Sequence, residues 1–435
     1  MRQPVSGFSK KSKEEKIKWL IATYFNNDNS FIKIIQQYYN SDTALQQLHD
    51  DFIENAITNF YLPFGVAPNF LINGALYTMP MVLEESSVVA AASNASKFWL
   101  ERGGFTAEVI STTKNGQVHI DFYGDTDTLT DFFEITKPKL IASIDALQKN
   151  MKKRGGGLLT IELLNASETL EGYYQLHCTF ETLDAMGANF INSCLEQIAT
   201  TFEAEAHTYT AFGSTKPKVV MSILSNYVPE CLVRAEVTCK VTDLKQKDVS
   251  GEIFAANFVR AINIAKSATR RAVTHNKGIM NGIDAVVLAT GNDFRAIEAG
   301  VHAYASKNGY YSSLTHAKVE DGVFRFWIEV PLALGTVGGL TSLHPMAKFA
   351  LHLLQNPSAR ELMQLVAVAG LAQNFAAIKS LVTVGIQKGH MKMHLMNILN
   401  QLGATLAEKE KALVHFKEIS VSHNAVENFI TQLRN

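Results

Sequence analysis

The feature that most constrains the fold is an alternation of short strands and amphipathic helices between about residues 105 and 218. Along this stretch the hydrophobic spacing changes between a period of two and a period near 3.6, and turn-forming residues separate the segments. The predicted order is strand 117–122, helix 128–151, strand 158–164, strand 173–180, helix 188–205 and strand 219–224. Two helices among four short strands are typical of a compact ferredoxin-like α+β unit.

The segments on either side of this unit are mostly helical. Helical patterning runs to about residue 59, and a strand-and-turn region with the turn Asn73-Gly74 follows it. A helix rich in small residues then ends at the glycine pair 103–104. Beyond the small unit we predict helices 251–272, 295–306, 345–354 and 359–381, with strands at 285–289 and 324–330.

These patterns predict an α+β fold class with three domains. A large, mostly helical domain takes residues 1–109 and 219–380, and the ferredoxin-like domain of residues 110–218 is inserted into it. Residues 381–435 form a C-terminal flap of three helices, and Gly385 and Gly389 bracket its link to the rest of the chain. A module on a glycine-containing link is a candidate lid.

Composition and charge exclude several functional classes. Apolar residues make up 47% of the chain and charged residues 19%, which suits a packed soluble protein. The formal net charge of -1 argues against nucleic acid or an anionic membrane as the main partner. The four cysteines show no CxxC spacing, and no segment predicts a signal peptide or a membrane span. We therefore expect a cytoplasmic protein with reduced thiols and no membrane partner.

Three charged side chains stand at predicted junctions. Lys277 and Asp293 lie in turns rich in glycine and asparagine, off the two ends of the predicted strand 285–289, and Glu85 lies between a strand and a helix. If the three converge at one end of a sheet, the ammonium can polarise a carbonyl while a half-buried carboxyl donates a proton. The plainer interpretations are that Glu85 stabilises a helix start, that Asp293 caps a helix and that Lys277 is solvated.

Two further motifs carry candidate binding or catalytic groups. In "DAMGAN" Asp184 stands where a helix should begin, and small residues in the first turn would admit a phosphate to the backbone amides. The alternative is a capped helix packed closely on a sheet. In "GHMKMH" the spacing of His390 and His394 suits zinc, but no third ligand is evident, so we predict no metal site. A histidine on a lid suits general acid catalysis better.

Taken together, these segments resemble one family closely, the class II, soluble bacterial-type hydroxymethylglutaryl-CoA reductases. The matching stretches are "ENAITNFYLPFGVAPNFLING" (54–74), "EESSVVAAASNASK" (84–97), "DAMGAN" (184–189), "SGEIF…RRAVTHNKGIMNGIDAVVLATGNDFRAIEAGVHAYA" (250–305), "GTVGG" (335–339), "VAGLAQNFAA" (368–377) and "GIQKGHM" (385–391). They follow the family's order over nearly the whole chain, and the run around Lys277 and Asp293 is the most specific.

The resemblance implies reduction of hydroxymethylglutaryl-CoA to mevalonate and free CoA by two hydride transfers from a nicotinamide cofactor, through mevaldyl-CoA and mevaldehyde. It implies Glu85 as the proton donor to the nascent alkoxide and Lys277 as the cation that stabilises the carbonyl oxygen. Asp293 would bridge and tune these two groups. His390 would protonate the departing CoA thiolate from a mobile flap.

The resemblance also implies the binding residues and the assembly. The substrate carboxylate would lie at Arg271 and Ser87, and the other predicted substrate-binding residues are Asn281, Gln373 and Asn374. The predicted cofactor-binding residues are Asp184, Met186, Gly187, Asn189, Asn226 and Gln148, which makes 110–218 the cofactor-binding domain. The family forms homodimers or assemblies of dimers, with active sites at the dimer interface.

The chain departs from the family pattern near these sites. Thr58 replaces a glycine and Ser86 a proline, which affects the backbone near Glu85 more than the chemistry. Some relatives that prefer NADH carry an acidic residue for the adenosine ribose where this chain has Gln148, with lysines 149, 152 and 153 after it. The missing carboxylate and the nearby cations favour NADPH over NADH.

Other functions stay open beside this prediction. One is the reverse, catabolic oxidation of mevalonate. A second is a nicotinamide-independent CoA-thioester lyase or transferase with Lys277 as base, against which the 184–189 loop argues. A third is a non-catalytic CoA- or nucleotide-binding homologue, which the intact set of predicted catalytic residues disfavours.

Overall fold

The computed structural model describes residues 4–246, 249–383, 395–417, 419 and 421–435. The chain forms two compact units, Met1–Pro63 and Phe64–Asn435. The first unit holds a short 3-10 helix, Phe8–Lys10, and three helices, α1 (Lys13–Tyr24), α2 (Ser30–Gln37) and α3 (Thr43–Asp50), which confirms the predicted helical start. A capping box formed by Ser12 and Glu15 begins α1, because each side chain accepts from the backbone N–H of the other residue.

The second unit begins with an antiparallel hairpin of β1 (Phe64–Ile72) and β2 (Ala75–Val82). The predicted Asn73-Gly74 turn joins the two strands with positive φ angles of 48° and 84°, as a two-residue hairpin turn requires. Helix α4 (Val88–Leu100) follows, and Gly104 beyond its end donates to the carbonyl of Trp99. Three predicted features of this segment, a turn, a helix and a glycine cap, are therefore confirmed.

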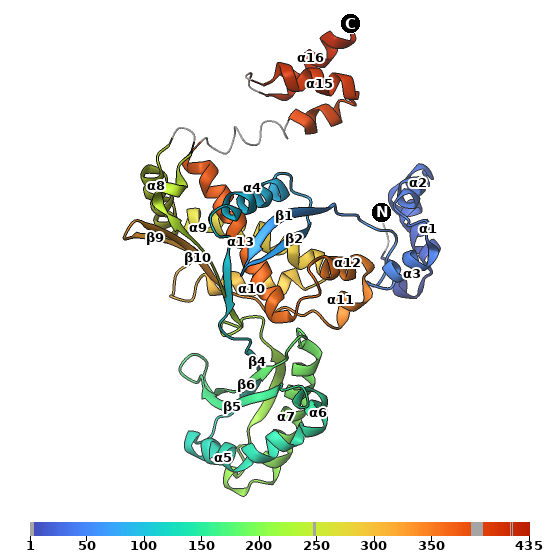
Figure 1. Cartoon of the computed structure of the whole chain (residues 1–435). Coiled ribbons are helices and arrows are strands. Elements are labelled where there is room, and N and C mark those ends of the chain that lie inside the picture. The colour runs from blue at the N-terminus through green and yellow to red at the C-terminus, as the bar shows by residue number, and fades with distance from the viewer. Residues whose placement is uncertain (1–3, 247–248, 384–394, 418, 420) are drawn as a thin grey trace. The chain divides into compact units, whose positions relative to one another are not determined.

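A four-stranded antiparallel sheet lies at the centre of the large core, in the order β3 (Thr106–Val109), β8 (Leu232–Lys240), β10 (Val323–Pro331) and β9 (Thr315–Glu320). Its buried aromatic rings contact rings of α4, α8 (Gly251–Ser267) and α13 (Ala359–Val382), and α9 (Thr269–Ala289) packs against α13. In Figure 1, α8 lies beside β9 and α13 beside β10. Strand β10 confirms the strand predicted at 324–330. Strands β8 and β9 were not predicted, so this part of the chain is less helical than expected.

The predicted strand 285–289 is wrong, because helix α9 continues through it to Ala289. The segment is apolar on every side and packs against α13, and a short run of this kind cannot be distinguished from a buried strand by periodicity. Gly282 is also not a turn residue. A Cβ on it would lie 2.4 Å from the carbonyl oxygen of Ala369, so glycine here permits close packing of α9 on α13.

The inserted segment has the predicted ferredoxin-like order. Its elements are β4 (Lys114–Asp121), α5 (Thr126–Ser143), α6 (Asp145–Lys152), β5 (Gly157–Asn165), β6 (Tyr173–Glu181), α7 (Ala188–Thr208) and β7 (Lys218–Leu224). The sheet order is β5-β6-β4-β7 and every pair is antiparallel. Alternate residues of β6 enter a hydrophobic core of this segment's own. The one predicted helix 128–151 is two helices, which meet at Ile144.

The remaining helices include α10 (Phe294–Tyr304), α11 (Gly339–Leu343) and α12 (Pro345–Leu353). At the C-terminus a helix at 395–401, α15 (Leu406–His415) and α16 (His423–Arg434) share a small hydrophobic core, which confirms the three predicted helices. Helix α13 is long and apolar enough to cross a membrane, yet 67% of its most apolar window is buried, as in the core helix of a soluble protein. All four cysteines are free thiols.

Candidate active site

The link between β2 and α4 places Glu85 against the middle of α9. Its carboxylate forms an ion pair and hydrogen bond with the ammonium of Lys277, 192 residues further along the chain. The side chain of Glu85 is 43% exposed and that of Lys277 is 58% exposed, so the pair is open to a ligand. Such a pair can exchange a proton with a bound carbonyl group and stabilise negative charge on its oxygen.

Asp293 is the N-cap of α10, which was the plainer of its two interpretations. Its Oδ1 accepts hydrogen bonds from the backbone N–H groups of Arg295 (3.0 Å) and Ala296 (3.2 Å), and it also pairs with the Arg295 side chain at 3.1 Å. Within the described part of the chain its Oδ2 has no hydrogen bond, and no contact joins it to Glu85 or Lys277. The cap occupies one oxygen and leaves the other available.

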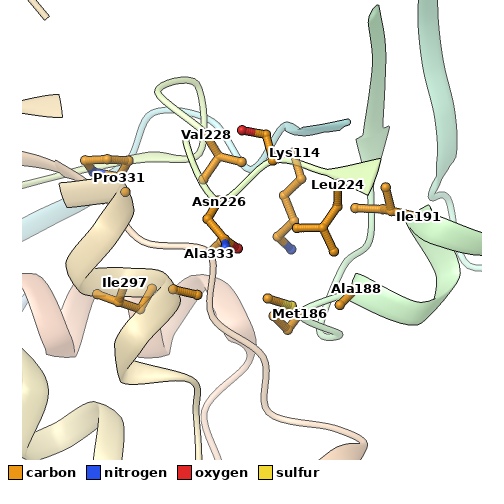
Figure 2. A pocket seen from close by; sticks show the side chains of 13 residues that line it. Lys114, Met186, Ala188, Ile191, Leu224, Asn226, Val228, Ile297, Pro331 and Ala333 are labelled. Atoms are coloured by element: carbon orange, nitrogen blue, oxygen red, sulfur yellow. The ribbon is translucent and has the colours of Figure 1, made fainter. Parts of the chain in front are cut away.

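The "DAMGAN" motif forms a loop that leads into α7 and lines a pocket (Figure 2). Helix α7 begins at Ala188 with Gly187 as N-cap, so the expectation that Asp184 opens the helix is wrong. Gly187 has a φ of 93°, and a Cβ on it would lie 2.5 Å from Thr182, so only glycine fits. Met186 of the loop lines the pocket with Asn226, which follows β7, and with Ile297 of α10.

The loop before α7 is held from several sides. The Asp184 carboxylate accepts from the backbone N–H of Ala359 at 2.8 Å, in the first turn of α13. The carbonyl of Asp184 accepts from the N–H of Thr336 at 2.8 Å, and a Cβ on Gly335 would lie 2.5 Å from the nitrogen of Met186. The "GTVGG" stretch therefore packs against "DAMGAN". Gly335 lies at the point of closest approach, where a side chain would not fit.

Comparison with known proteins identifies the family of this chain. The sequence model described as hydroxymethylglutaryl-coenzyme A reductase matches residues 14–395. This chain belongs to the hydroxymethylglutaryl-coenzyme A reductase family. It is 37% identical over 416 residues to the 3-hydroxy-3-methylglutaryl-coenzyme A reductase of Archaeoglobus fulgidus, covering 95% of this chain and 90% of that protein. It is 34% identical over 402 residues to the probable reductase of Borreliella burgdorferi, covering 90% and 89%.

Solved structures agree with this assignment. The class II reductase from Streptococcus pneumoniae, in a structure bound to NADPH in open conformations, matches with a TM-score of 0.71 at 34% identity. That match covers 88% of this chain and 100% of the other. The resemblance to class II enzymes and the α+β fold class are thereby confirmed. The protein is an NAD(P)H-dependent oxidoreductase that converts hydroxymethylglutaryl-CoA to mevalonate.

The predicted carboxylate-binding groups of the reductase lie on α9 and at the start of α4. Asn281 follows Lys277 by four residues and so shares its face of α9. Arg271 precedes Lys277 on the same helix and is half-buried, and this burial lowers the pKa of its guanidinium. Ser87 is the N-cap of α4 with a φ of 76°, an uncommon conformation for a residue other than glycine.

Gln373 and Asn374 lie in the buried middle of α13. The Asn374 Oδ1 accepts from the Thr315 hydroxyl at 3.0 Å, and that hydroxyl lies 2.7 Å from Nε2 of His275. Burial, and then the nearby charge of Arg271, lower the pKa of His275 to about 3, so the ring stays neutral. The Gln373 Oε1 and the His275 Nδ1 are buried without a hydrogen-bond partner among the described residues.

The structure adds an acidic pair that the sequence did not indicate. Asp284 on α9 faces Glu298 on α10, and burial followed by the Glu298 carboxyl raises the pKa of Asp284 to about 9. Glu298 also pairs with His302 at 2.7 Å, and this contact lowers the pKa of Glu298. The pair joins the two helices that carry Lys277 and Asp293. Nothing in the spacing of the sequence alone links these two carboxyl groups.

Gln148 is fully buried in the reductase. Its Oε1 accepts from the N–H of Leu158 at 3.1 Å and its amide donates to Asp145 at 3.3 Å, so the side chain holds α6 to the start of β5. Two of the exposed charged groups near it, Asp145 and Lys152, form an ion pair at 2.8 Å. A role for Gln148 at a bound ribose stays a prediction.

The predicted acid of the flap, His390, lies outside the described residues, as does His394. Within the described part of the chain no group of three or more potential metal-ligating side chains comes together. Asn189 is the second residue of α7 and is exposed. Of the predicted site residues, the structure brings together Glu85 with Lys277 and Met186 with Asn226.

Proposed function

We propose that this reductase works in the synthetic direction, with Glu85, Lys277, Asp293 and His390 as its catalytic residues. The observation that carries this proposal is the ion pair between Glu85 and Lys277, which two distant segments form at an accessible surface. A reduced nicotinamide supplies a hydride in each of the two reductions. Each hydride that reaches the carbonyl carbon leaves negative charge on the oxygen, where an ammonium and a proton donor are needed together.

Lys277 stabilises that oxygen in both reductions, and Glu85 delivers the proton to it. Between the two reductions the hydroxyl of mevaldyl-CoA returns its proton to the Glu85 carboxylate, the carbon–sulfur bond breaks, the aldehyde forms and the thiolate leaves. His390 donates the proton that converts the thiolate to the free thiol of CoA. Because this acid acts at only one step, it can reside on a segment that closes and reopens, which also permits exchange of the cofactor.

Asp293 has a supporting role beside this pair. Its Oδ1 is occupied by the start of α10, and its Oδ2 is available to the lysine ammonium when substrate is bound. A second carboxylate near the ammonium would orient it toward the carbonyl oxygen that it polarises. Capping and catalysis therefore use different oxygens of one carboxylate.

The substrate carboxylate binds to Arg271 and Ser87, with Asn281 in the same pocket. Arginine suits this role because its guanidinium presents two parallel N–H groups to a carboxylate. Gln373 and Asn374 support the region of the CoA thioester. Among the described residues the buried Gln373 Oε1 has no hydrogen-bond partner, as for a polar group that meets its partner only in a complex.

The cofactor binds at the loop of Asp184, Met186, Gly187 and Asn189, with Asn226 on the opposite side of the pocket. The pocket that Met186 and Asn226 share supports this assignment. We propose NADPH as the preferred cofactor. The absence of an acidic residue at 148 and the lysines that follow it permit a phosphate on the adenosine ribose.

We further propose a cytoplasmic homodimer, or an assembly of dimers, with the active site at the dimer interface. Residues 110–218 form the cofactor-binding domain, 1–109 and 219–380 the large domain, and 381–435 the flap. The separate hydrophobic cores of the 110–218 segment and of the C-terminal helices support this division.

The test is oxidation of NADPH and of NADH, followed by absorbance, with hydroxymethylglutaryl-CoA as substrate and CoA release measured in parallel. We expect two molecules of NADPH oxidised per CoA released, and faster turnover with NADPH at limiting concentration. Cleavage of the thioester without nicotinamide would instead establish the lyase or transferase. A strong preference for NADH would contradict the cofactor assignment, and a reaction that runs only from mevalonate would contradict the direction.

A further inference from the structure

Lys114, at the start of β4, is a buried lysine in the wall of the cofactor pocket. Only 4% of it is exposed, although lysine is almost never buried to this extent without a specific partner. Its ammonium donates to the hydroxyl of Thr182 and to the carbonyl oxygen of Ala185, at 3.1 Å for the carbonyl. Both acceptors belong to the loop that leads into α7, so this amine holds the loop from the side of the sheet.

Carboxylates surround this ammonium without a direct ion pair among the described residues. Burial lowers the pKa of Lys114, and the nearby charges of Glu181 and Asp184 oppose this shift. Glu181 already accepts from the hydroxyl of Thr112 and from the N–H of Leu183, and Asp184 accepts from Ala359. These carboxylates are therefore fixed by other groups, and they stabilise the ammonium only through space.

The orientation of Lys114 indicates more than a structural role. Figure 2 shows its side chain reaching down into the pocket, with the amine toward Met186. An ammonium has three N–H donors, and two are used among the described residues. The nearby start of α7 adds backbone N–H groups with no side-chain cap, since Gly187 has none to offer. A buried cation and a helix N-terminus at one pocket together favour a phosphate group.

We propose that Lys114 is a cofactor-binding residue that donates its third N–H to a pyrophosphate oxygen of the nicotinamide dinucleotide. This inference rests on the proposed cofactor site and adds to it a residue from outside the 184–189 loop. The same amine fixes the loop and contacts the ligand, so loop position and anion recognition are set by one side chain.

The experiment measures the dissociation constants of the reduced cofactor and of ADP-ribose for the full-length protein. ADP-ribose keeps the pyrophosphate and lacks the nicotinamide ring. For Lys114→Met we expect both constants to rise about tenfold or more, as for loss of a charged hydrogen bond, with affinity for CoA unchanged. Lys139→Met is the matched control, because Lys139 is an exposed lysine of the same segment, and it should bind as wild type.

A second variant separates contact with the ligand from support of the loop. Thr182→Val removes the loop hydroxyl that Lys114 holds but keeps the amine, so it should weaken cofactor binding far less than Lys114→Met. Equal losses in the two variants would overturn the proposal, as would a Lys114→Met protein that loses the dinucleotide but keeps ADP-ribose. Wild-type protein that binds neither NADPH nor NADH would instead refute the cofactor site itself.

Discussion

Gly282 of α9 packs directly on the carbonyl of Ala369 in α13. A Cβ at position 282 would come within 2.4 Å of that oxygen. Gly278 lies four residues before Gly282 in the same helix. A Cβ on Gly278 would have no neighbouring atom within 4 Å. These two glycines of one helix therefore have opposite structural requirements, although the sequence presents them as equivalent.

Alanine at these positions should change stability in opposite directions. Gly282→Ala forces two core helices apart, and overpacking of this kind costs ~1–3 kcal/mol. In Gly278→Ala the added methyl group enters open space. Because alanine is a better helix former than glycine, this substitution should stabilise the protein by up to ~1 kcal/mol. Thermal unfolding measures both, with the two single variants as each other's control. A Gly282→Ala protein as stable as wild type would contradict the close contact.

Lys277→Ala should remove both reductions, because the same ammonium stabilises oxygen in each. We expect a loss of about 10³-fold in kcat with hydroxymethylglutaryl-CoA and with mevaldehyde alike. Lys318→Ala, which removes a lysine paired with Glu320 on the surface, is the control and should keep full activity. Loss with only one of the two substrates would show that Lys277 acts in a single step.

His390→Ala should separate the two halves of the reaction. Reduction of free mevaldehyde needs no acid for a thiolate, so it should stay near the wild-type rate. The thioester reaction should fall about 10²-fold or more, as expected for loss of a general acid. Steady-state rates with the two substrates provide the comparison. Equal losses of rate with the two substrates would contradict the proposed role of His390 as the acid that protonates the thiolate.

Substitutions of Asp293 should distinguish the helix cap from the catalytic carboxylate. Asparagine caps a helix about as well as aspartate, whereas alanine costs ~1 kcal/mol. Asp293→Asn should therefore keep the melting temperature and lose activity, and Asp293→Ala should lower both. An active Asp293→Asn enzyme would assign this residue to capping alone.

Asp284 should make the stability of the protein depend on pH. Its pKa is raised from an ordinary value of 3.8 to about 9 in the folded protein. Between these values the folded state keeps a proton that the unfolded state has lost, so the free energy of unfolding falls as pH rises. Glu298, with a lowered pKa, is ionised in both states over most of this range and does not oppose the trend.

The variant Asp284→Asn removes this titration. Its melting temperature relative to wild type should therefore be higher at about pH 8 than at about pH 5. The difference between variant and wild type at the two pH values is the measured quantity. A difference that stays constant would mean that Asp284 is ionised in the folded protein.

Local patterns predicted much of this fold. The strands and helices of the inserted segment have clear hydrophobic periodicity. Their order along the chain was therefore sufficient to predict a ferredoxin-like unit. Strand β8 shows the same alternation, with Val233, Ala235 and Val237 inward, yet its place at the sheet centre depends on β10, far away in sequence. The strand predicted at 285–289 failed because a helix buried on all sides has no polar face to reveal its period.

The charged pair of the site could be predicted from the motifs, whereas its surroundings could not. Glu85 and Lys277 meet as expected, but the neutral His275 and its partners Thr315 and Asn374 come from three separate elements. Lys114 is a similar case, since only the fold shows that it is buried beside the loop before α7. Contacts of this kind depend on tertiary packing, which no local spacing encodes.

The continuous path of α9 restricts how this segment can change in evolution. Lys277, Asn281 and Asp284 stand on one face of a single helix that is packed on α13. Each residue of a helix turns the chain by about 100°, so inserting or deleting one residue after Lys277 would swing Asn281 and Asp284 away from that face. The segment can therefore exchange side chains at its solvent positions, but its length is fixed by the site that it carries.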